Sequence, residues 1–314
     1  MSRGAPGAWD SAYHAPVLAG EITELFQDSK SILDCTLGGG GHSAALLAMG
    51  ATVTAIDRDA DAVAEAKKRL AAHEAAGRFR VILGNFAEID TLLPDPSQKF
   101  DGILADLGVS SHQIDDASRG FSFREGAPLD MRMSSTAAMT AADFLENASD
   151  EELAQVFRDY GDEPKARRLA REIVRRRQNR AFVTSDDLVG AIRAVLGPRS
   201  GPGEFARLFQ AVRIAVNDEM RALERALPLL RDRLNPGGTL AVIAYHSGED
   251  RLVKHEMREW SRDCICPPRQ LECSCRGRSL GTLVTRKPVN ATENEIERNP
   301  RARSARLRAW RSQG

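Results

Sequence analysis

The stretch DCTLGGGGHS, residues 34–43, constrains the fold of this chain more than any other. An apolar run leads into four glycines, and small and apolar residues that favour a helix follow at once. Glycine has no side chain, so a turn of this kind lets the backbone approach a bound ligand closely. The stretch predicts a strand, a ligand-binding turn and a helix. It leaves three ligands open: a dinucleotide, a nucleoside triphosphate or another adenosine cofactor.

Strand-like and helix-like segments alternate along the first part of the chain. Apolar runs predict strands at residues 31–37, 51–57, 78–85 and 100–108, with helical segments between them. Such alternation predicts a parallel sheet that is covered by helices on both faces. Because the crossovers are right-handed, the carboxyl ends of the strands share one edge of the sheet, which is where ligands bind in such folds.

The alternation stops after Ser111. Residues 115–217 contain several helical runs and no clear strand pattern. Strand-like runs return at residues 239–247, 280–288 and 305–312. We therefore expect a sheet domain made of residues 1–114 and 218–314, interrupted by a helical insertion domain at residues 115–217 that recognises the substrate.

Charge is balanced overall and strongly segregated along the chain. There are 44 basic and 44 acidic residues, yet residues 164–181 hold eight Lys or Arg against one Glu, and residues 297–311 hold six Arg against one Glu. Local basic patches on a neutral chain suggest a polyanion that is contacted at those patches. The alternative interpretation is a solvated, arginine-rich helix face.

Composition also bears on the compartment. No run of about 18 apolar residues is present, and the first residues lack the apolar core of a signal peptide. The five cysteines do not resemble a disulfide framework in a chain of 314 residues. We expect a cytoplasmic protein without a membrane partner.

The residues of the glycine turn narrow the choice among these three ligands. It lacks the Gly-Lys-Ser/Thr ending that would bring a lysine to a phosphate, which argues against a triphosphate. A dinucleotide fingerprint is imperfect, because Gly38 and Gly40 are followed by Ser43 where a third glycine is usual.

The ends of the next strands point to an adenosine ligand. Asp57 ends the second predicted strand and is placed to accept hydrogen bonds from ribose hydroxyls. Phe86 follows the third strand, where an adenine could rest against its ring. Asp106 ends the fourth. Nicotinamide dehydrogenases and methyltransferases that use S-adenosylmethionine both fit these features.

The end of the chain favours methyl transfer over hydride transfer. A helix precedes the segment NPGGTLAVIAYHS, residues 235–247, and two short strand-like runs follow. This order matches a seven-stranded methyltransferase sheet that ends in an antiparallel hairpin. A nicotinamide dehydrogenase would more often add a separate substrate domain.

Nine motifs, spread across nearly the whole chain, carry a specific resemblance. They are HAPVL (14–18), GGGGHS (38–43), AIDRD (55–59), DLGVSSHQID (106–115), RGFSF (119–123), LDMRM (129–133), FQAVRIAVN (209–217), YHSGEDR (245–251) and NPRARSARLR (299–308). In these motifs and their order the sequence resembles the MraW/RsmH family of bacterial 16S rRNA cytosine-N4 methyltransferases. It departs from the family pattern at Tyr245 and Gly248, where Phe and Leu are usual, and at Gly39, where an arginine is common.

The resemblance implies a class I S-adenosylmethionine-dependent methyltransferase, with a Rossmann-like seven-stranded sheet and an inserted helical domain. It implies cofactor contacts at Gly40, Gly41, His42, Asp57, Phe86, Asp106 and Gln113. The implied activity is methylation of N4 of a decoding-centre cytidine in 16S rRNA. The sequence leaves open whether naked rRNA or the 30S subunit is the substrate, and a homodimer is compatible with it.

A cytosine amine is a poor nucleophile, because its lone pair is delocalised into the ring. Orienting it is a large share of the catalysis, and a carboxylate that accepts an N4–H bond would expose the lone pair and help remove the proton. The chain lacks the Asn/Asp/Ser-Pro-Pro-aromatic motif that many amine methyltransferases use. We hypothesise that Asp106 is this acceptor, although it could instead serve only the cofactor. Asp130 in the LDMRM loop is the second catalytic candidate.

The target base must also be splayed from the RNA and held. Phe121, Phe123 and Tyr245 are candidates for stacking on it, and all three are equally compatible with a place in the core. An arginine-rich helix in the insertion is expected to contact RNA phosphates. Its residues are Arg167, Arg168, Arg171, Arg175, Arg176 and Arg177.

Two wider alternatives stay open at this point. One is an S-adenosylmethionine enzyme that acts on another RNA or on DNA. The other is an RNA-binding assembly factor that keeps the fold without catalysis.

Four cysteines form two C-x-C pairs at Cys264, Cys266, Cys273 and Cys275. Four thiols so close in sequence could hold zinc. The spacing is not the usual C-x-x-C, however, and the implied activity needs no metal, so we expect none. A redox-labile pair and a plain loop are the other interpretations.

Overall fold

The computed structural model describes residues 16–134, 137–267, 270 and 272–313. The chain divides into two compact units, one of Met1–Gly108 with Arg221–Gly314 and one of Val109–Met220. We call them the sheet unit and the helical unit. None of the helices in the described residues has both the length and the apolar character that crossing a bilayer requires.

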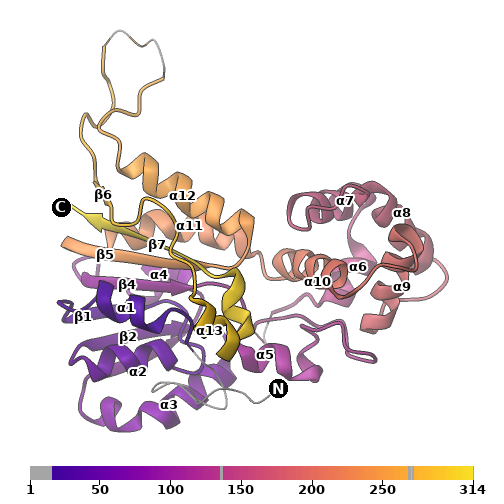
Figure 1. Cartoon of the computed structure of the whole chain (residues 1–314), viewed down its shortest axis with the longest axis horizontal. Coiled ribbons are helices and arrows are strands. Elements are labelled where there is room, and N and C mark those ends of the chain that lie inside the picture. The colour runs from indigo at the N-terminus through magenta and orange to yellow at the C-terminus, as the bar shows by residue number, and fades with distance from the viewer. Residues whose placement is uncertain (1–15, 135–136, 268–269, 271, 314) are drawn as a thin grey trace. The chain divides into compact units, whose positions relative to one another are not determined.

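The sheet unit is built on one seven-stranded sheet with the order β3-β2-β1-β4-β5-β7-β6 (Figure 1). The strands are β1 (Ser31–Asp34), β2 (Thr52–Asp57), β3 (Phe79–Leu83), β4 (Phe100–Asp106), β5 (Leu234–Ala244), β6 (Gly281–Leu283) and β7 (Arg306–Ser312). Strands β1 to β5 pair in parallel, and β7 pairs antiparallel with both β5 and β6. The predicted α/β class and the antiparallel end of the sheet are confirmed.

Helices bury both faces of this sheet. Neighbouring residues on a strand point to opposite faces, and accordingly Ile32 and Leu33 of β1 belong to different apolar clusters. One cluster includes residues of α1 (Ala19–Leu25), α2 (Gly41–Ala48) and α3 (Ala60–Ala75). The other includes residues of α4 (Ile89–Leu92), α11 (Glu219–Asp232) and α12 (Ser247–Trp260). The long apolar strand runs in the sequence reflect this two-sided burial.

Shorter elements complete the sheet unit. They are the 3-10 helices η1 (Phe86–Glu88) and η3 (Pro300–Ser304) and the helix α13 (Glu293–Arg298). Glu295 of α13 accepts a hydrogen bond from the backbone N–H of Leu18 at 2.7 Å, so the two ends of the chain are linked at this point.

The helical unit contains short helices with sequence-encoded starts. They are α5 (Ser111–Asp115), η2 (Ala117–Arg119), α6 (Ala141–Asn147), α7 (Asp150–Asp159), α8 (Ala166–Arg177), α9 (Ser185–Leu196) and α10 (Pro202–Val216). The Ser149 hydroxyl accepts from the N–H of Glu152 at 3.1 Å and caps α7. The Asp187 carboxylate accepts from the N–H of Thr184 at 2.9 Å and ties the start of α9.

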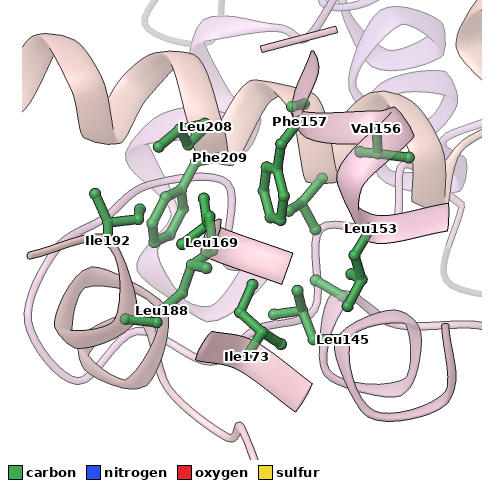
Figure 2. Packing of buried hydrophobic residues seen from close by; sticks show 14 of the residues in the cluster. Leu145, Leu153, Val156, Phe157, Leu169, Ile173, Leu188, Ile192, Leu208 and Phe209 are labelled. Atoms are coloured by element: carbon green, nitrogen blue, oxygen red, sulfur yellow. The ribbon is translucent and has the colours of Figure 1, made fainter. Parts of the chain in front are cut away.

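This unit has an apolar core of its own (Figure 2). The core draws on pairs of residues spaced by about one helical turn: Leu153 and Phe157 on α7, Leu169 and Ile173 on α8, Leu188 and Ile192 on α9, with Leu208 and Phe209 on α10. Each is at most 2% exposed. Burying a side chain of this size contributes about 1.5–3 kcal/mol, so the core stabilises the helical unit.

Candidate functional site

The glycine turn joins β1 to α2 and needs its glycines for two reasons. Gly38 and Gly40 have φ values of 50° and 74°, in the left-handed region that glycine adopts without strain. A Cβ on Gly40 would also lie 3.2 Å from Leu70 Cδ1, and one on Gly41 would lie 2.9 Å from Pro16 Cδ. Helix packing therefore accounts for part of the glycine pattern, and backbone conformation for the rest.

Asp57 holds this turn from the end of β2. Its Oδ2 accepts from the N–H of Gly38 at 2.7 Å, and its Oδ1 accepts from the N–H of Asp59 at 2.9 Å. Burial raises the pKa of Asp57 to about 6. The two N–H groups favour the charged form and oppose this rise, but burial outweighs them. Each carboxylate oxygen still has a lone pair left for a further donor. The position suits the expected ribose contact.

Asp34 at the end of β1 is a site residue that the sequence reasoning missed. It is fully buried, and its Oδ2 accepts from the hydroxyl of Ser43 on α2 at 2.7 Å. Burial raises the pKa of Asp34, while the Ser43 hydrogen bond opposes that shift. An acid in a buried strand run, four residues before the first glycine of the turn, is the signal that could have identified it.

Asp106 at the end of β4 contacts two other elements of the sheet unit. Its Oδ1 accepts from the hydroxyl of Tyr245 at 2.9 Å. Its Oδ2 lies 3.4 Å from Nε2 of His42, which follows the glycine turn. Its own backbone N–H donates to Thr36 Oγ1 at 2.7 Å. Burial, followed by the Asp106 carboxylate, raises the pKa of Tyr245 well above its usual value, so the phenol stays a donor at neutral pH.

His42 is a buried side chain of the sheet unit whose hydrogen-bonding capacity is not filled by the described residues. Its ring is 3% exposed, and neither ring nitrogen makes a hydrogen bond within the described residues. A buried polar group without a partner is costly, which commonly marks a place where a ligand or water binds. Its Nε2 lies 3.4 Å from Asp106 Oδ2, and the residue stands at the start of α2, so the residues fit an adenosine cofactor with an anionic group.

The YHSGEDR motif holds Tyr245 and begins α12. Glu249 is 3% exposed, and its Oε2 accepts from the backbone N–H of Tyr245 at 2.9 Å. Its Oε1 lies 3.2 Å from Nε2 of His246. Asp250 forms a two-bond ion pair with Arg308 of β7, at 2.6 and 3.1 Å. The motif thus anchors the β5 end of the site rather than supplying a second exposed acid.

Phe86 lies just after β3, as expected, in η1. Asn85 starts this turn by accepting from the N–H of Ala87 at 3.0 Å. The ring of Phe86 is partly buried and packs against the apolar cluster that includes α4 and α11. Its partial exposure is compatible with the expected adenine contact.

Gln113 and Asp130, two other expected site residues, belong to the helical unit. The Gln113 Oε1 accepts from the N–H of Ser110 at 2.9 Å, which closes a capping box on α5. Asp130 forms a two-bond ion pair with Arg132, at 2.9 and 2.8 Å. Burial would raise the pKa of Asp130, but the hydrogen bonds from Arg132 outweigh it and lower the pKa. This weakens the case for Asp130 as a proton acceptor.

Three of the matching motifs meet inside the helical unit as a packing arrangement. Asn217, at the end of α10, accepts from the N–H of Met133 at 2.8 Å and donates to the carbonyl of Met131 at 2.7 Å. Arg119 donates to the carbonyls of Arg132 and Met133 at 3.2 and 3.1 Å. These bonds hold the LDMRM loop to its own unit.

The two phenylalanines of RGFSF pack against the helical core. Phe123 makes edge-to-face contacts with Phe205 and Phe209, with ring centroids 5.8 and 6.1 Å apart. Phe121 packs against the same cluster, with Arg119 over its ring at 5.9 Å. The structure therefore favours a core role for these two rings over base stacking.

The arginines of α8 divide into two groups. Arg167, Arg168, Arg171 and Arg175 are exposed. Arg176 and Arg177 are partly buried. Arg177 donates to the carbonyls of Leu145 and Ala148 at 3.0 and 2.7 Å, and thereby caps the end of α6. Glu172 pairs with Arg175 and Arg176, and these pairs lower its pKa to about 2.

Other proteins resemble this chain along almost its full length. Residues 11–313 match the family described as the MraW methylase family. "Ribosomal RNA small subunit methyltransferase H" of Gemmatimonas aurantiaca is 61% identical over 310 residues, which are 99% of this chain and 98% of that protein. The proteins of the same name from Heliobacterium modesticaldum and Myxococcus xanthus are 43% and 44% identical, over 95% and 94% of this chain and 97% and 96% of theirs.

Proposed function

The chain belongs to the MraW methylase family, and we propose that it transfers a methyl group from S-adenosylmethionine to N4 of a decoding-centre cytidine in 16S rRNA. The relatives named above are small-subunit rRNA methyltransferases, which supports the substrate class. The assignment of the methylated atom and nucleotide rests on the nine sequence motifs. Such an enzyme would act in the cytoplasm, on rRNA alone or within the 30S subunit.

One observation carries the proposal: three strand ends of the sheet unit present acids beside one glycine turn. Asp34, Asp57 and Asp106 end β1, β2 and β4, and each is tied to the turn or to the start of α2. His42, at the start of α2, lies 3.4 Å from Asp106 through Nε2, and within the described residues neither of its ring nitrogens makes a hydrogen bond, which supports a ligand at this place.

These residues fit S-adenosylmethionine. The cofactor supplies a methyl group activated on a sulfonium, which an amine can displace with loss of a proton. Asp57 would accept the ribose hydroxyls, and Phe86 would lie against the adenine. Gly40, Gly41 and His42, at the amino end of α2, would receive the carboxylate, because helix amino ends favour anions. Gln113 stays a proposed contact from the helical unit.

Asp106 is our candidate for the group that handles the amine. Tyr245 donates to one of its oxygens and fixes the carboxylate plane. The lone pairs left on Asp106 can accept an N4–H bond, which turns the amine lone pair outward and takes up the leaving proton. The same geometry would also serve a role in cofactor binding alone. Asp106→Asn separates the two roles.

The helical unit would bind RNA through α8. Its exposed arginines, Arg167, Arg168, Arg171 and Arg175, lie opposite the buried residues Leu169, Ala170 and Ile173 of the same helix. A cationic face of this kind suits phosphates, to which guanidinium groups bind strongly. Arg176 and Arg177 would contribute through helix packing rather than by direct contact.

The test is transfer of labelled methyl from S-adenosylmethionine to 30S subunits that lack the modification, and in parallel to naked 16S rRNA, with nucleoside analysis of the product. N4-methylcytidine from either substrate supports the proposal, and the better substrate answers the assembly question. Methylation of a different nucleoside would contradict the N4 assignment. Cofactor binding without transfer to either RNA would favour another nucleic acid or a non-catalytic assembly role.

A further inference from the structure

The segment between α12 and β6 brings four cysteine sulfurs together. The Sγ atoms of Cys264, Cys266, Cys273 and Cys275 all lie within 4.8 Å of one another. Four of the distances between them are 3.5, 3.8, 3.8 and 3.9 Å. The two C-x-C pairs, separated by six residues in sequence, thus converge on a single point in space.

These distances match the edges of a metal-centred tetrahedron. Zinc binds thiolates at about 2.3 Å in tetrahedral geometry, which places neighbouring sulfurs about 3.8 Å apart. A disulfide needs about 2.05 Å between sulfurs, so the observed spacing is far too long for two disulfides. Sulfurs packed at random on a loop have no reason to adopt six mutually short distances.

The described residues of this loop form no apolar core that could explain the convergence. Ile265 is 40% exposed, and none of the described residues from Cys264 to Ser279 is buried. A segment whose side chains are at most partly buried offsets little of the entropy of ordering its backbone. Metal ligation is a source of the missing stability, since binding energy in such sites is folding energy.

The base of the loop is closed by hydrogen bonds to the end of α12 and to the residues that follow it. The Leu280 N–H donates to the carbonyl of Trp260 at 2.8 Å, and the Ser279 N–H donates to Asp263 Oδ1 at 3.1 Å. Arg276 donates to the carbonyl of Arg262 at 2.9 Å and also to that of Glu259. The cysteine cluster therefore stands on a stem that is closed by hydrogen bonds.

Neighbouring donors suit a charged sulfur cluster. The N–H of Ile265 donates to the Sγ of Cys275 at 3.3 Å. Arg262, which pairs with Glu259 at 2.8 Å, and Arg276, which donates to the carbonyl of Arg262, lie in the stem of the same loop. Four thiolates around one divalent cation carry two net negative charges, and N–H donors and guanidinium groups near the sulfurs stabilise them.

We propose that Cys264, Cys266, Cys273 and Cys275 hold one structural zinc ion that fixes the loop between α12 and β6. All four ligands come from the protein, so the site is closed and leaves no position for substrate or water. Zinc binding displaces the protons of the thiols as the Zn–S bonds form, with no change of redox state. The proposal departs from our expectation of no metal, and it is independent of the methyl-transfer function.

Elemental analysis of the full chain, purified in reducing buffer without chelators, provides the first test. We expect about one zinc per chain, and loss of that zinc in Cys266→Ser and in Cys275→Ser. Ser274→Ala is the matched control, because it alters the residue between two ligands without removing a sulfur, and it should keep the metal. Circular dichroism melts of all variants show whether the two units stay folded when the zinc is lost.

Cobalt substitution tests the geometry directly. Protein stripped of metal and loaded with Co²⁺ should show the intense visible bands of tetrahedral thiolate coordination, and Zn²⁺ should abolish them. No metal in the wild-type protein, together with no thiolate bands from Co²⁺, would overturn the proposal. So would disulfides found by mass spectrometry under non-reducing conditions, or iron in place of zinc. Zinc that persists in both serine variants would place the ion elsewhere.

Discussion

In the sheet unit, polar side chains converge at strand ends, whereas in the helical unit the polar side chains of the matching motifs hold loops to helices. Asp57 and Asp106 are tied by two hydrogen bonds or close contacts each and keep lone pairs for a ligand. Asn217 and Asp130 are occupied by the LDMRM loop itself. A polar residue in a matching motif is therefore a functional candidate only if its hydrogen-bonding capacity is not already filled.

The acids at the strand ends also differ from the paired acids of the helical unit in what shifts their pKa values. At the strand ends, burial raises the pKa values of Asp34 and Asp57. In the helical unit, ion pairs with arginines lower the pKa values of Asp130 and Glu172. A carboxyl pKa that burial raises, with no cation paired to the group, is typical of ligand-binding sites. The experiments below test whether this difference between the acids is functional.

The largest expected effect is that of Asp106→Asn on turnover. The amide has nearly the same shape and can still accept from Tyr245, but its NH₂ group cannot accept an N4–H bond. We expect kcat to fall by about 10²-fold or more, while the KM for S-adenosylmethionine changes little. Steady-state transfer to 30S subunits, at varied cofactor concentration, measures both.

Asp101→Asn is the matched control on the same strand. Asp101 lies near the opposite end of β4, where it accepts from the N–H groups of Lys30 and Ser31, each at 3.0 Å. Its loss should affect stability without changing kcat. If Asp106→Asn kept normal kcat and normal cofactor affinity, the catalytic role would be wrong. If it lost only cofactor affinity, Asp106 would be a cofactor-binding residue.

The next largest effect concerns the packing of the helical unit. A Cβ on Gly120, whose φ is +72°, would lie 2.2 Å from the carbonyl oxygen of Pro128 and 2.8 Å from the nitrogen of Asp130. Gly126 has a φ of +73° but open space around it. We expect Gly120→Ala to cost about 3 kcal/mol or more of unfolding free energy, and Gly126→Ala about 1 kcal/mol.

Urea denaturation, followed by circular dichroism, distinguishes these two variants. Both share the left-handed conformation, so the difference between them isolates the close approach of the RGFSF and LDMRM segments. Equal losses would show that this approach contributes nothing. The RGFSF and LDMRM motifs would then not act through packing at Gly120.

A smaller effect is expected for the arginine face of α8. Arg168→Gln combined with Arg171→Gln should weaken RNA binding roughly tenfold at low salt, and should reduce the salt slope by about 0.7–0.9 for each lost phosphate contact. Arg158→Gln on α7 is the control, because Arg158 is exposed but already pairs with Asp159 at 2.9 Å. Titration of 16S rRNA at several salt concentrations gives both quantities. An unchanged slope would mean that α8 is a solvated face only.

Much of the sheet unit could be predicted from sequence, because its signals are local. A strand buried on both faces must be an apolar run, and glycine at positive φ marks the turn after β1. Asp57 and Asp106 stood out because they interrupt such runs. Asp34 interrupts such a run as well, but its hydrogen bond joins it to Ser43 of another element, and sequence spacing does not reveal that bond.

The helical unit was harder to interpret because its polar contacts join distant segments. Asn217 reaches Met131 and Met133 across more than eighty residues. Arg177 looks like its neighbours in sequence, yet the helical periodicity turns it toward the end of α6. The cysteine cluster has the same character, since C-x-C spacing alone could not show that the two pairs converge. Only the fold distinguishes exposed arginines from partly buried ones, and separate thiols from clustered ones.

The smallest effect, and the finest test of the comparison, is the pH dependence of cofactor affinity. The pKa of Asp57 is raised to about 6 without a ligand, and ribose hydroxyls that donate to it would favour the charged form and lower that pKa. Below pH 6, binding must then release a proton. Affinity should therefore be constant above about pH 7, and should fall up to about tenfold per pH unit below 6, as protonation of the free protein competes.

Isothermal titration calorimetry with S-adenosylmethionine between pH 5 and 8, in two buffers of different ionisation heat, measures affinity and proton release together. Asp57→Asn cannot titrate and should flatten the profile while lowering affinity at pH 7. If the wild-type profile is already flat, or if the slope survives in Asp57→Asn, the raised pKa has no link to the cofactor. Asp57 would then only hold the glycine turn in place, as Asn217 and Arg119 hold the LDMRM loop of the helical unit.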